Sequence, residues 1–128
     1  MTPARHRVLL VDDNADSSEP LSLLLQSKGF ETEISTDGES ALKTADAFLP
    51  DCVVLDLGLP GIDGYEVARQ LRTRQYGKGM VLVALTGWAG KEVRTRAADA
   101  GFDYHLVKPV NWEELERIVE SVARTSAT

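Results

Sequence analysis

The chain has 128 residues, close to the commonest size of a single folded domain. Its composition, 43% hydrophobic and 27% charged, can form and cover one core and excludes a disordered chain. The formal net charge of −6 argues against a nucleic-acid-binding surface, because such surfaces need clustered Lys and Arg. The one cysteine, Cys52, excludes an internal disulfide and lies in an apolar run, where we expect it to be buried.

Neither a targeting segment nor a membrane span is expected. Residues 1–7 are polar and lack an apolar stretch of signal-peptide length. No apolar run approaches the roughly 18 residues that a transmembrane helix needs. We therefore expect a cytoplasmic protein without membrane insertion.

The first half of the chain alternates short apolar runs with amphipathic segments. The predicted elements are a strand at residues 8–11, a helix that stops at Gly29, an edge strand at 30–35, a helix that runs to about Phe48 and a buried strand at 52–55. Since Pro20 is tolerated in a first turn, we expect the first helix to begin near Ser17 or Ser18. Thr36 and Glu39 have capping-box spacing, which predicts the start of the second helix.

The second half continues the alternation. The predicted elements are a loop at residues 58–64, a helix carrying Tyr65, Val67, Ala68 and Leu71, a turn at 76–79, a strand at 80–85, a weakly apolar helix at 91–100, a strand at 104–107 and a final helix. Asn111 and Glu114 repeat the capping spacing and predict where that final helix starts. Residues 124–128 are expected to be a loose tail.

Five strands alternating with five helices predict an α/β fold. Such a pattern forms a doubly wound parallel sheet with helices on both faces, joined by right-handed crossovers. No internal repeat or low-complexity linker divides the chain. We expect one domain over residues 1–128, with a core at about 6–123 and short tails.

Polar residues follow the predicted strands at the point where each strand ends. These residues are Asp12, Asp13, Asp56, Thr86 and Lys108. In an open parallel α/β sheet the carboxyl ends of the strands lie along one edge, where ligands bind. Residues scattered over most of the chain are therefore expected to meet in one site.

The chemistry expected of this site is phosphoryl transfer. Three carboxylates placed together repel unless a cation joins them, and Mg²⁺ prefers oxygen ligands. A carboxylate beside Mg²⁺ can act as a nucleophile and form an aspartyl phosphate. Lys108 supplies a second positive charge, and the hydroxyl of Thr86 can donate a hydrogen bond to a phosphoryl oxygen.

The segments that carry these residues resemble the receiver (chemotaxis-regulator-like) domain family of two-component signalling. They are Val-Leu-Leu-Val-Asp-Asp at 8–13, Val-Val-Leu-Asp-Leu-Gly-Leu-Pro-Gly-Ile-Asp-Gly at 53–64, Ala-Leu-Thr-Gly at 84–87 and Leu-Val-Lys-Pro at 106–109. Each fragment alone is a weak signal, but four in this order, each closing a strand, are specific. The resemblance covers nearly the whole chain and implies a flavodoxin-like (βα)5 fold with strand order 2-1-3-4-5.

The resemblance also implies a role for each site residue. Asp56 would be the phosphoacceptor, and Asp13 and Asp56 would ligate Mg²⁺ directly. The carbonyl of Gly58 would be a third protein ligand, and Asp12 would act largely through a bound water. Lys108 would pair with Asp56 or with the phosphoryl group. Thr86 would sense the phosphate.

Further implications concern the lysine and the partners. The peptide bond before Pro109 would be cis and would aim Lys108. A histidine kinase or a histidine phosphotransfer protein would donate the phosphoryl group. The chain would act as a switch rather than an enzyme, with intrinsic self-phosphorylation and self-dephosphorylation only. Its partner-binding face would comprise the fourth helix, the fifth strand and the fifth helix.

One departure from the family pattern concerns the switch. Three residues before the lysine the family usually has an aromatic residue, and here the position holds His105. Strand alternation places Tyr104 on the opposite face, so it does not substitute. We hypothesise that His105 hydrogen-bonds differently in the two states and makes signalling sensitive to pH.

The output partner stays open between a separate output protein and a parent hybrid kinase. The segments Leu-Thr-Gly-Trp at 85–88 and His-Leu-Val-Lys-Pro-Val at 105–110 are similar to receivers of hybrid histidine kinases and to free-standing relatives. Gly58 and Gly87 are expected to leave the rim of the site uncrowded.

The sequence argues against two other functions. A phosphatase with an aspartate nucleophile generally needs a second acid two residues later, and that position is Gly58. A receiver-shaped scaffold that never takes phosphate would be marked by loss of Asp56 or Lys108, and both are present. Simpler structural roles are an acidic pair at a helix start for Asp12 and Asp13, and a helix cap for Thr86.

Overall fold

The computed structural model describes residues 6–59, 61–88 and 90–126, with side chains described as far as residue 122. Over these residues, five parallel strands alternate with five α-helices. The strands are β1 (Arg7–Val11), β2 (Glu31–Ser35), β3 (Cys52–Asp56), β4 (Val81–Thr86) and β5 (Tyr104–Val107). The helices are α1 (Ala15–Ser27), α2 (Gly38–Phe48), α3 (Gly64–Thr73), α4 (Lys91–Ala100) and α5 (Trp112–Ser126), with a short 3₁₀ helix η1 at Gln75–Lys78.

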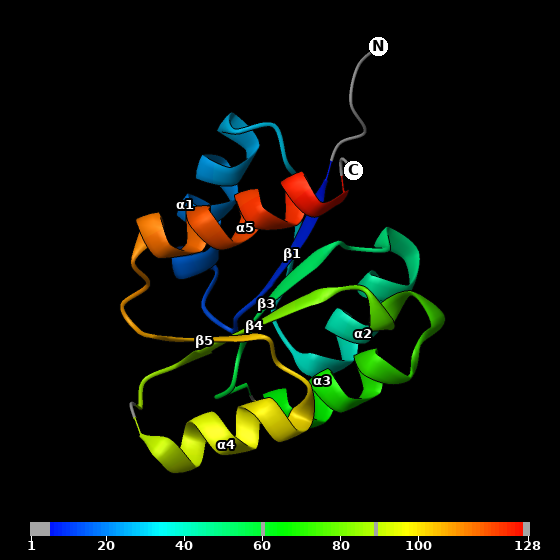
Figure 1. Cartoon of the computed structure of the whole chain (residues 1–128), viewed down its shortest axis with the longest axis vertical. Coiled ribbons are helices and arrows are strands. Elements are labelled where there is room, and N and C mark those ends of the chain that lie inside the picture. Colours follow the sequence, from blue (N-terminus) through cyan, green and yellow to red (C-terminus); the bar gives the residue numbers. More distant parts are fainter. Residues whose placement is uncertain (1–5, 60, 89, 127–128) are drawn as a thin grey trace.

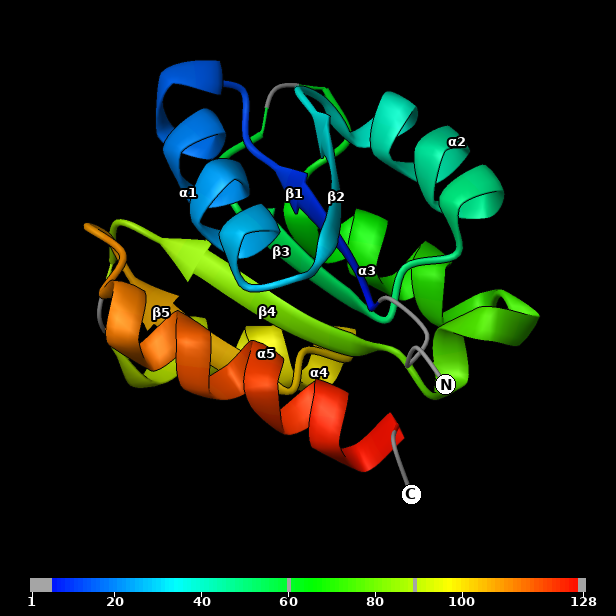
Figure 2. The same cartoon turned by 90° about the horizontal axis from the view of Figure 1, so that it is seen from above.

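The sheet has the order β2-β1-β3-β4-β5, with β3 at its centre. Helices α1 and α5 cover one face, and α2, α3 and α4 cover the other (Figures 1 and 2). The fold class and the strand order are therefore confirmed. No helix within the described ranges combines the length and the hydrophobicity needed to span a bilayer.

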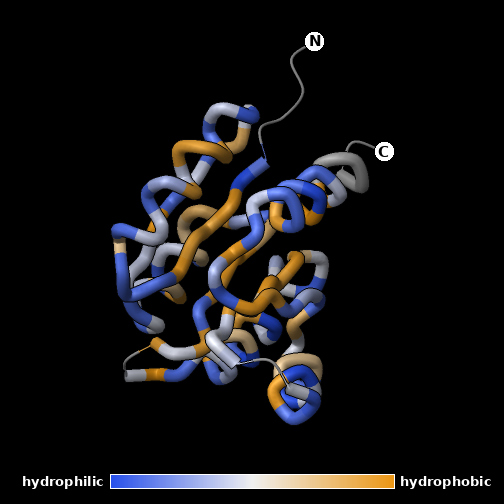
Figure 3. The backbone as a smooth tube through the Cα atoms, turned by 90° about the vertical axis from the view of Figure 1, so that its left-hand side faces the viewer, coloured by the Kyte–Doolittle hydropathy of each residue, from blue (hydrophilic) through white to orange (hydrophobic). Residues whose placement is uncertain are grey.

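Each face of the sheet carries its own apolar core. Leu9, Val53 and Leu82 point to the face under α2, α3 and α4, while Leu10, Val54 and Val83 point to the face under α1 and α5. All five residues of β3 are buried, as expected of a parallel strand with helices on both sides. In Figure 3 the most hydrophobic stretches of the backbone run through the central strands, and the helices alternate in hydropathy.

Helix α1 begins earlier than the sequence predicted. Asn14 caps it, since its side chain accepts a hydrogen bond from the backbone N–H of Asp16, and the helix starts at Ala15. Pro20 therefore lies inside the helix and not in its first turn. A proline there removes the hydrogen bond to the carbonyl four residues before it, and burial of Leu25 against the sheet helps to hold the helix in place.

Two further helix boundaries were wrong. Asp37, and not Thr36, caps α2 by accepting from the backbone N–H of Ser40. Helix α5 continues to Ser126, so residues 124–126 are helical and not a loose tail, because no glycine or proline follows Val122 to stop the helix. The predicted tail at residues 1–5, Pro60 of the family motif and the final residues 127–128 lie outside the described part of the chain.

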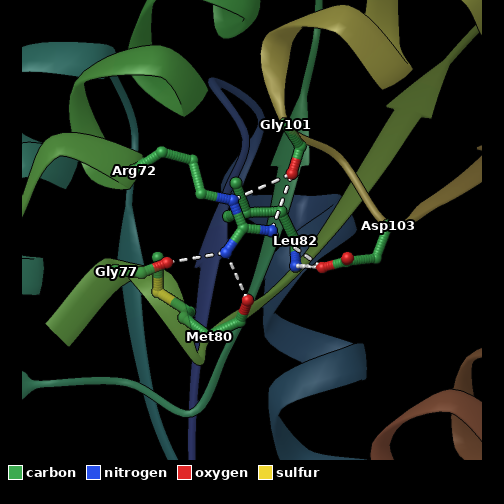
Figure 4. A network of polar contacts seen from close by, with 6 residues as sticks. All are labelled: Arg72, Gly77, Met80, Leu82, Gly101 and Asp103. Carbon is green, nitrogen blue, oxygen red and sulfur yellow. Dashed lines mark hydrogen bonds and ion pairs between the residues drawn. The ribbon is translucent and has the colours of Figure 1, made fainter.

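Arg72 connects several segments at the edge of the sheet opposite the carboxyl ends of the strands (Figure 4). Its guanidinium donates hydrogen bonds to the carbonyl groups of Gly77, Met80 and Gly101 and to the carboxylate of Asp103. Asp103 also accepts from the backbone N–H of Leu82. The end of α3 is thereby joined to the start of β4 and to the end of α4.

We predict that Arg72→Met lowers the free energy of unfolding by about 2–4 kcal/mol, because several partly buried carbonyl groups lose their donors. Chemical denaturation followed by circular dichroism measures this. The matched control is Arg69→Met on the same helix, whose side chain is half exposed and, among the described residues, forms an ion pair only with Glu66. That change should stay within about 0.5 kcal/mol, and equal effects of the two substitutions would contradict the role given to Arg72.

Candidate functional site

The polar residues that end the strands meet at the carboxyl edge of the sheet. Asp12 follows β1, Asp56 closes β3, Thr86 closes β4 and Lys108 follows β5. Asp12, Asp13 and Asp56 each place a carboxylate oxygen within 4.8 Å of the others. Asp12 and Asp56 are each only 6% exposed, whereas Asp13 is exposed. The sequence-predicted acidic cluster is therefore present.

Lys108 supplies the positive charge of this cluster. Its Nζ lies 2.6 Å from Oδ2 of Asp56 and 3.7 Å from Oδ2 of Asp12. Burial alone would lower the pKa of Lys108, but its hydrogen bond to Asp56 and the surrounding carboxylates outweigh burial and raise that pKa. The peptide bond between Lys108 and Pro109 is cis, as the family resemblance implied.

Backbone N–H groups hold two of the carboxylates. The N–H of Asn14 donates to Oδ1 of Asp12 at 2.9 Å, and the N–H of Gly58 donates to Oδ1 of Asp56 at 2.8 Å. In both cases the chain turns directly after the strand, which aims an N–H two residues later back at the side chain. Burial raises the pKa of the Asp12 carboxyl, although the Asn14 N–H and Lys108 act in the opposite direction.

Thr86 is buried and bonds within its own loop. Its Oγ1 accepts a hydrogen bond from the backbone N–H of Trp88 at 3.1 Å. Helix α4 has Gly90 at its N-cap position and no side-chain cap, so the suggestion that Thr86 caps this helix was wrong. Trp88 is 76% exposed. Thr86 is thus linked to an exposed aromatic residue two positions away.

His105 lies on the same side of the sheet as Thr86. The register pairs Ala84 with His105 and Thr86 with Val107, and alternate residues of a strand share a face. Its Nε2 is buried and has no hydrogen-bond partner among the described residues. Burial, and to a smaller extent the nearby charge of Arg94, lower the pKa of His105. Tyr104 points to the other face and is 42% exposed.

The donor set suits a hard divalent cation. The cluster offers carboxylate oxygens only, one exposed and two buried, which matches the preference of Mg²⁺ for oxygen ligands and for keeping several waters. Cysteine and histidine are absent from this group, so it does not resemble a zinc site.

The structure adds residues that the sequence did not reveal. A hollow in front of Asp56 is also lined by Tyr65 from α3 and by Val93 and Arg96 from α4. Counting strand ends does not find these residues, because they lie on helices. Arg96 lies on an exposed helical surface, where a charged side chain is expected in any case and does not indicate a functional site.

Comparison with known proteins agrees with this geometry. The family model described as the response regulator receiver domain matches residues 8–120. The chain belongs to this family. The receiver fold, the strand order and the acidic cluster at the carboxyl edge are thus all those of a two-component receiver.

Three relatives illustrate the range of the match. The DNA-binding response regulator MtrA of Mycobacterium tuberculosis is 36% identical over 115 residues, which cover 90% of this chain and 49% of MtrA. The chain thus spans about half the length of this curated relative. The receiver domain of the sensor histidine kinase PA1611 of Pseudomonas aeruginosa, solved with a magnesium ion in its active site cleft, is 31% identical (TM-score 0.82, 92% of this chain, 97% of that one). The chemotaxis regulator CheY4 of Vibrio cholerae is 29% identical (TM-score 0.86, 93% and 99%).

We predict that His105 makes the stability of the domain depend on pH. Because its folded pKa is lowered, protonation favours the unfolded state, so stability is full above the unfolded pKa of about 6.5 and falls as the pH drops below it. The free energy of unfolding should therefore decrease more between about pH 7.5 and about pH 5.5 in the wild type than in His105→Tyr. Denaturant titrations at both pH values measure the difference, and identical slopes would rule the effect out.

Proposed function

We propose that the chain is a magnesium-dependent phosphoryl acceptor of two-component signalling. Asp56 takes the phosphoryl group from the phosphohistidine of a histidine kinase or of a histidine phosphotransfer protein in the cytoplasm. The observation that carries the proposal is the contact of 2.6 Å between Lys108 Nζ and Asp56 Oδ2 inside a cluster of three carboxylates.

The metal site of the proposal uses residues of this cluster. Asp13 and Asp56 would ligate Mg²⁺ directly, the carbonyl of Gly58 would be a third ligand, and Asp12 would act through a water. When bound, the ion would neutralise charge on the phosphoryl oxygens. The magnesium ion coordinated in the active site cleft of the PA1611 receiver domain supports this assignment.

The protein groups have separate tasks in the transfer. A carboxylate oxygen of Asp56 attacks the phosphorus, the P–N bond to the donor imidazole breaks, and its electron pair stays on the nitrogen. Lys108 then pairs with the phosphoryl oxygens. The hydroxyl proton of Thr86 is free to donate to the same group, because in its bond with Trp88 the hydroxyl oxygen is the acceptor.

The change of state would start at Thr86. Movement of its hydroxyl toward a phosphoryl group would pull on the N–H of Trp88 through their hydrogen bond. The loop before α4 would then change position. In α4 only Ala97 and Ala100 are buried, which makes it the least anchored element of this side and suits a population shift. The face formed by α4, β5 and α5 would then bind an output protein or a parent hybrid kinase.

His105 would take the place of the usual aromatic switch residue. Its buried Nε2 has no hydrogen-bond partner within the described ranges, and a rearranged loop can offer it one. A neutral imidazole can accept such a bond through this nitrogen, whereas a protonated one cannot. The signalling state would therefore depend on pH, and equal partner affinity and pH profile in His105→Tyr would remove this part of the proposal.

A phosphatase is the less favoured function. A general acid two residues after the nucleophile is missing, because that position is Gly58, whose N–H is bound to Asp56. A scaffold that never takes phosphate is also disfavoured, since Asp56 and Lys108 are both present and in contact. Turnover of a phosphomonoester with Mg²⁺ would revive the phosphatase.

The proposal predicts covalent labelling of Asp56. Acetyl phosphate with Mg²⁺ should add one phosphoryl group to the wild-type chain, and chelation of the metal should prevent it. Asp56→Asn should abolish the label, while Asp63→Asn, which affects only the cap of α3, should retain it. Intact-protein mass spectrometry measures the added mass. Labelling of Asp56→Asn at the wild-type level would refute the assignment of the acceptor.

The proposal also predicts a movement of the loop that follows Thr86. Addition of Mg²⁺ and beryllofluoride, which mimics the bound phosphoryl group, should change the tryptophan fluorescence. The chain has a second indole at Trp112, so Trp88→Phe is the control and should lose most of the change. Asp56→Asn should show none. A change that persists in Trp88→Phe would place the movement elsewhere.

A further inference from the structure

Two sets of residues line the hollow in front of Asp56. Asp56, Thr86 and Lys108 are the groups of the proposed transfer. Tyr65, Trp88 and Arg96 line the same hollow and have no part in that transfer. A molecule that delivers a phosphoryl group to Asp56 through this hollow therefore comes near these residues.

The hollow is open at its rim. A Cβ built at Gly87 would meet nothing within 4 Å, and one at Gly58 would meet only Asp56 Oδ1 at 3.5 Å. Neither position has a side chain that obstructs entry. The space is therefore suited to a small donor as well as to the side chain of a protein donor.

Arg96 is the cation that α4 contributes to the lining of the hollow. Its guanidinium lies over the ring of Tyr65, 4.1 Å from the ring centroid. Tyr65 is only 8% exposed, so the ring is a fixed support for the charge. Within the described side chains, Arg96 has no ion pair, although Glu92 lies four positions earlier on the same helix. Lys108, in contrast, is already held by Asp56 and Asp12.

We propose that Arg96 selects small acyl phosphates as donors to Asp56. This inference rests on the proposed function, because it assigns a specificity role to the wall of the same site. An oxygen of Asp56 attacks the phosphorus, the bond from phosphorus to the bridging acyl oxygen breaks, and that oxygen leaves with the electron pair as a carboxylate. The unpaired guanidinium attracts both the dianionic donor and the departing carboxylate.

Arg96 should raise the rate of phosphoryl transfer less for donors whose leaving group is a nitrogen atom. Phosphoramidate carries less negative charge than acetyl phosphate near neutral pH, and its leaving group departs as neutral ammonia. The imidazole of a phosphohistidine likewise leaves without negative charge. The ratio of the labelling rate with acetyl phosphate to that with phosphoramidate therefore reports on Arg96, because the transfer to Asp56 is common to both donors.

The test measures second-order labelling rates of the full chain with acetyl phosphate and with phosphoramidate at fixed Mg²⁺. Arg96→Gln should lower the acetyl phosphate rate about threefold to fivefold and the phosphoramidate rate by less than about twofold, the size expected of one partly screened charge. Arg96→Lys should retain most of the wild-type ratio. Lys91→Gln removes another exposed cation of α4 that does not line the hollow, and it should leave the ratio unchanged.

The possible outcomes separate this inference from the proposed function. If neither donor labels the wild type on Asp56, the proposed function fails and the inference fails with it. If the wild type is labelled but the ratio is the same in Arg96→Gln, or falls equally in Lys91→Gln, the role of Arg96 is overturned and the proposed function stands. Thermal melting and the Mg²⁺ dissociation constant should be unchanged in Arg96→Gln, and a wild-type ratio in Arg96→Glu would equally overturn the inference.

Discussion

The ion pair between Lys108 and Asp56 is the interaction on which the site depends. Parallel strands that end at one edge bring three carboxylates within 4.8 Å of one another, and without a cation their charges would repel. Lys108 reaches across from the end of β5 to the end of β3, although β4 lies between these strands. The pair therefore requires the register of three strands at once. A site of this kind exists only when the whole sheet is formed.

At the opposite edge of the sheet, polar contacts anchor the C-terminal end of α4. There Arg72 bonds to the carbonyl of Gly101, directly after α4, while the other end of α4 has no side-chain cap. The helix is thus anchored at its C-terminal end and weakly held at the end that follows Thr86 and Trp88. In the proposed switch, a displacement that begins at Thr86 would meet the less constrained end of the helix first. Anchoring of α4 at its C-terminal end and weak attachment at its N-terminal end would then let a small movement reach the proposed binding face.

The sequence was sufficient for the features that follow from strand periodicity. Buried parallel strands appear as continuous apolar runs, so the polar residue that ends each run identifies the edge where the site forms. Helix starts were less predictable, because several nearby residues can cap. The side chains of Asn14 and Asp37 cap α1 and α2, although Ser17 and Thr36 can form the same kind of side-chain bond.

Contacts between helices were not predictable at all. Arg72 and Arg96 both lie on helical surfaces, where an arginine usually remains in solvent. Only the packed structure brings Arg72 over Gly101 and Arg96 over Tyr65. Sequence periodicity describes which face of a helix is buried, and it contains no information on which carbonyl or ring a long side chain reaches across that boundary.

The geometry that supports the proposed role of Asp56 as an acceptor also favours a switch over an enzyme that turns over phosphate esters. Hydrolysis of a phosphoaspartate needs a group that activates water, and turnover of an ester needs an acid for the leaving group. Gly58 offers neither, and the other described side chains of the hollow, outside the acidic cluster, are cationic, aromatic, aliphatic or a hydroxyl. In the proposed function, these cations and hydrogen-bond donors would stabilise a phosphoryl group bound to Asp56.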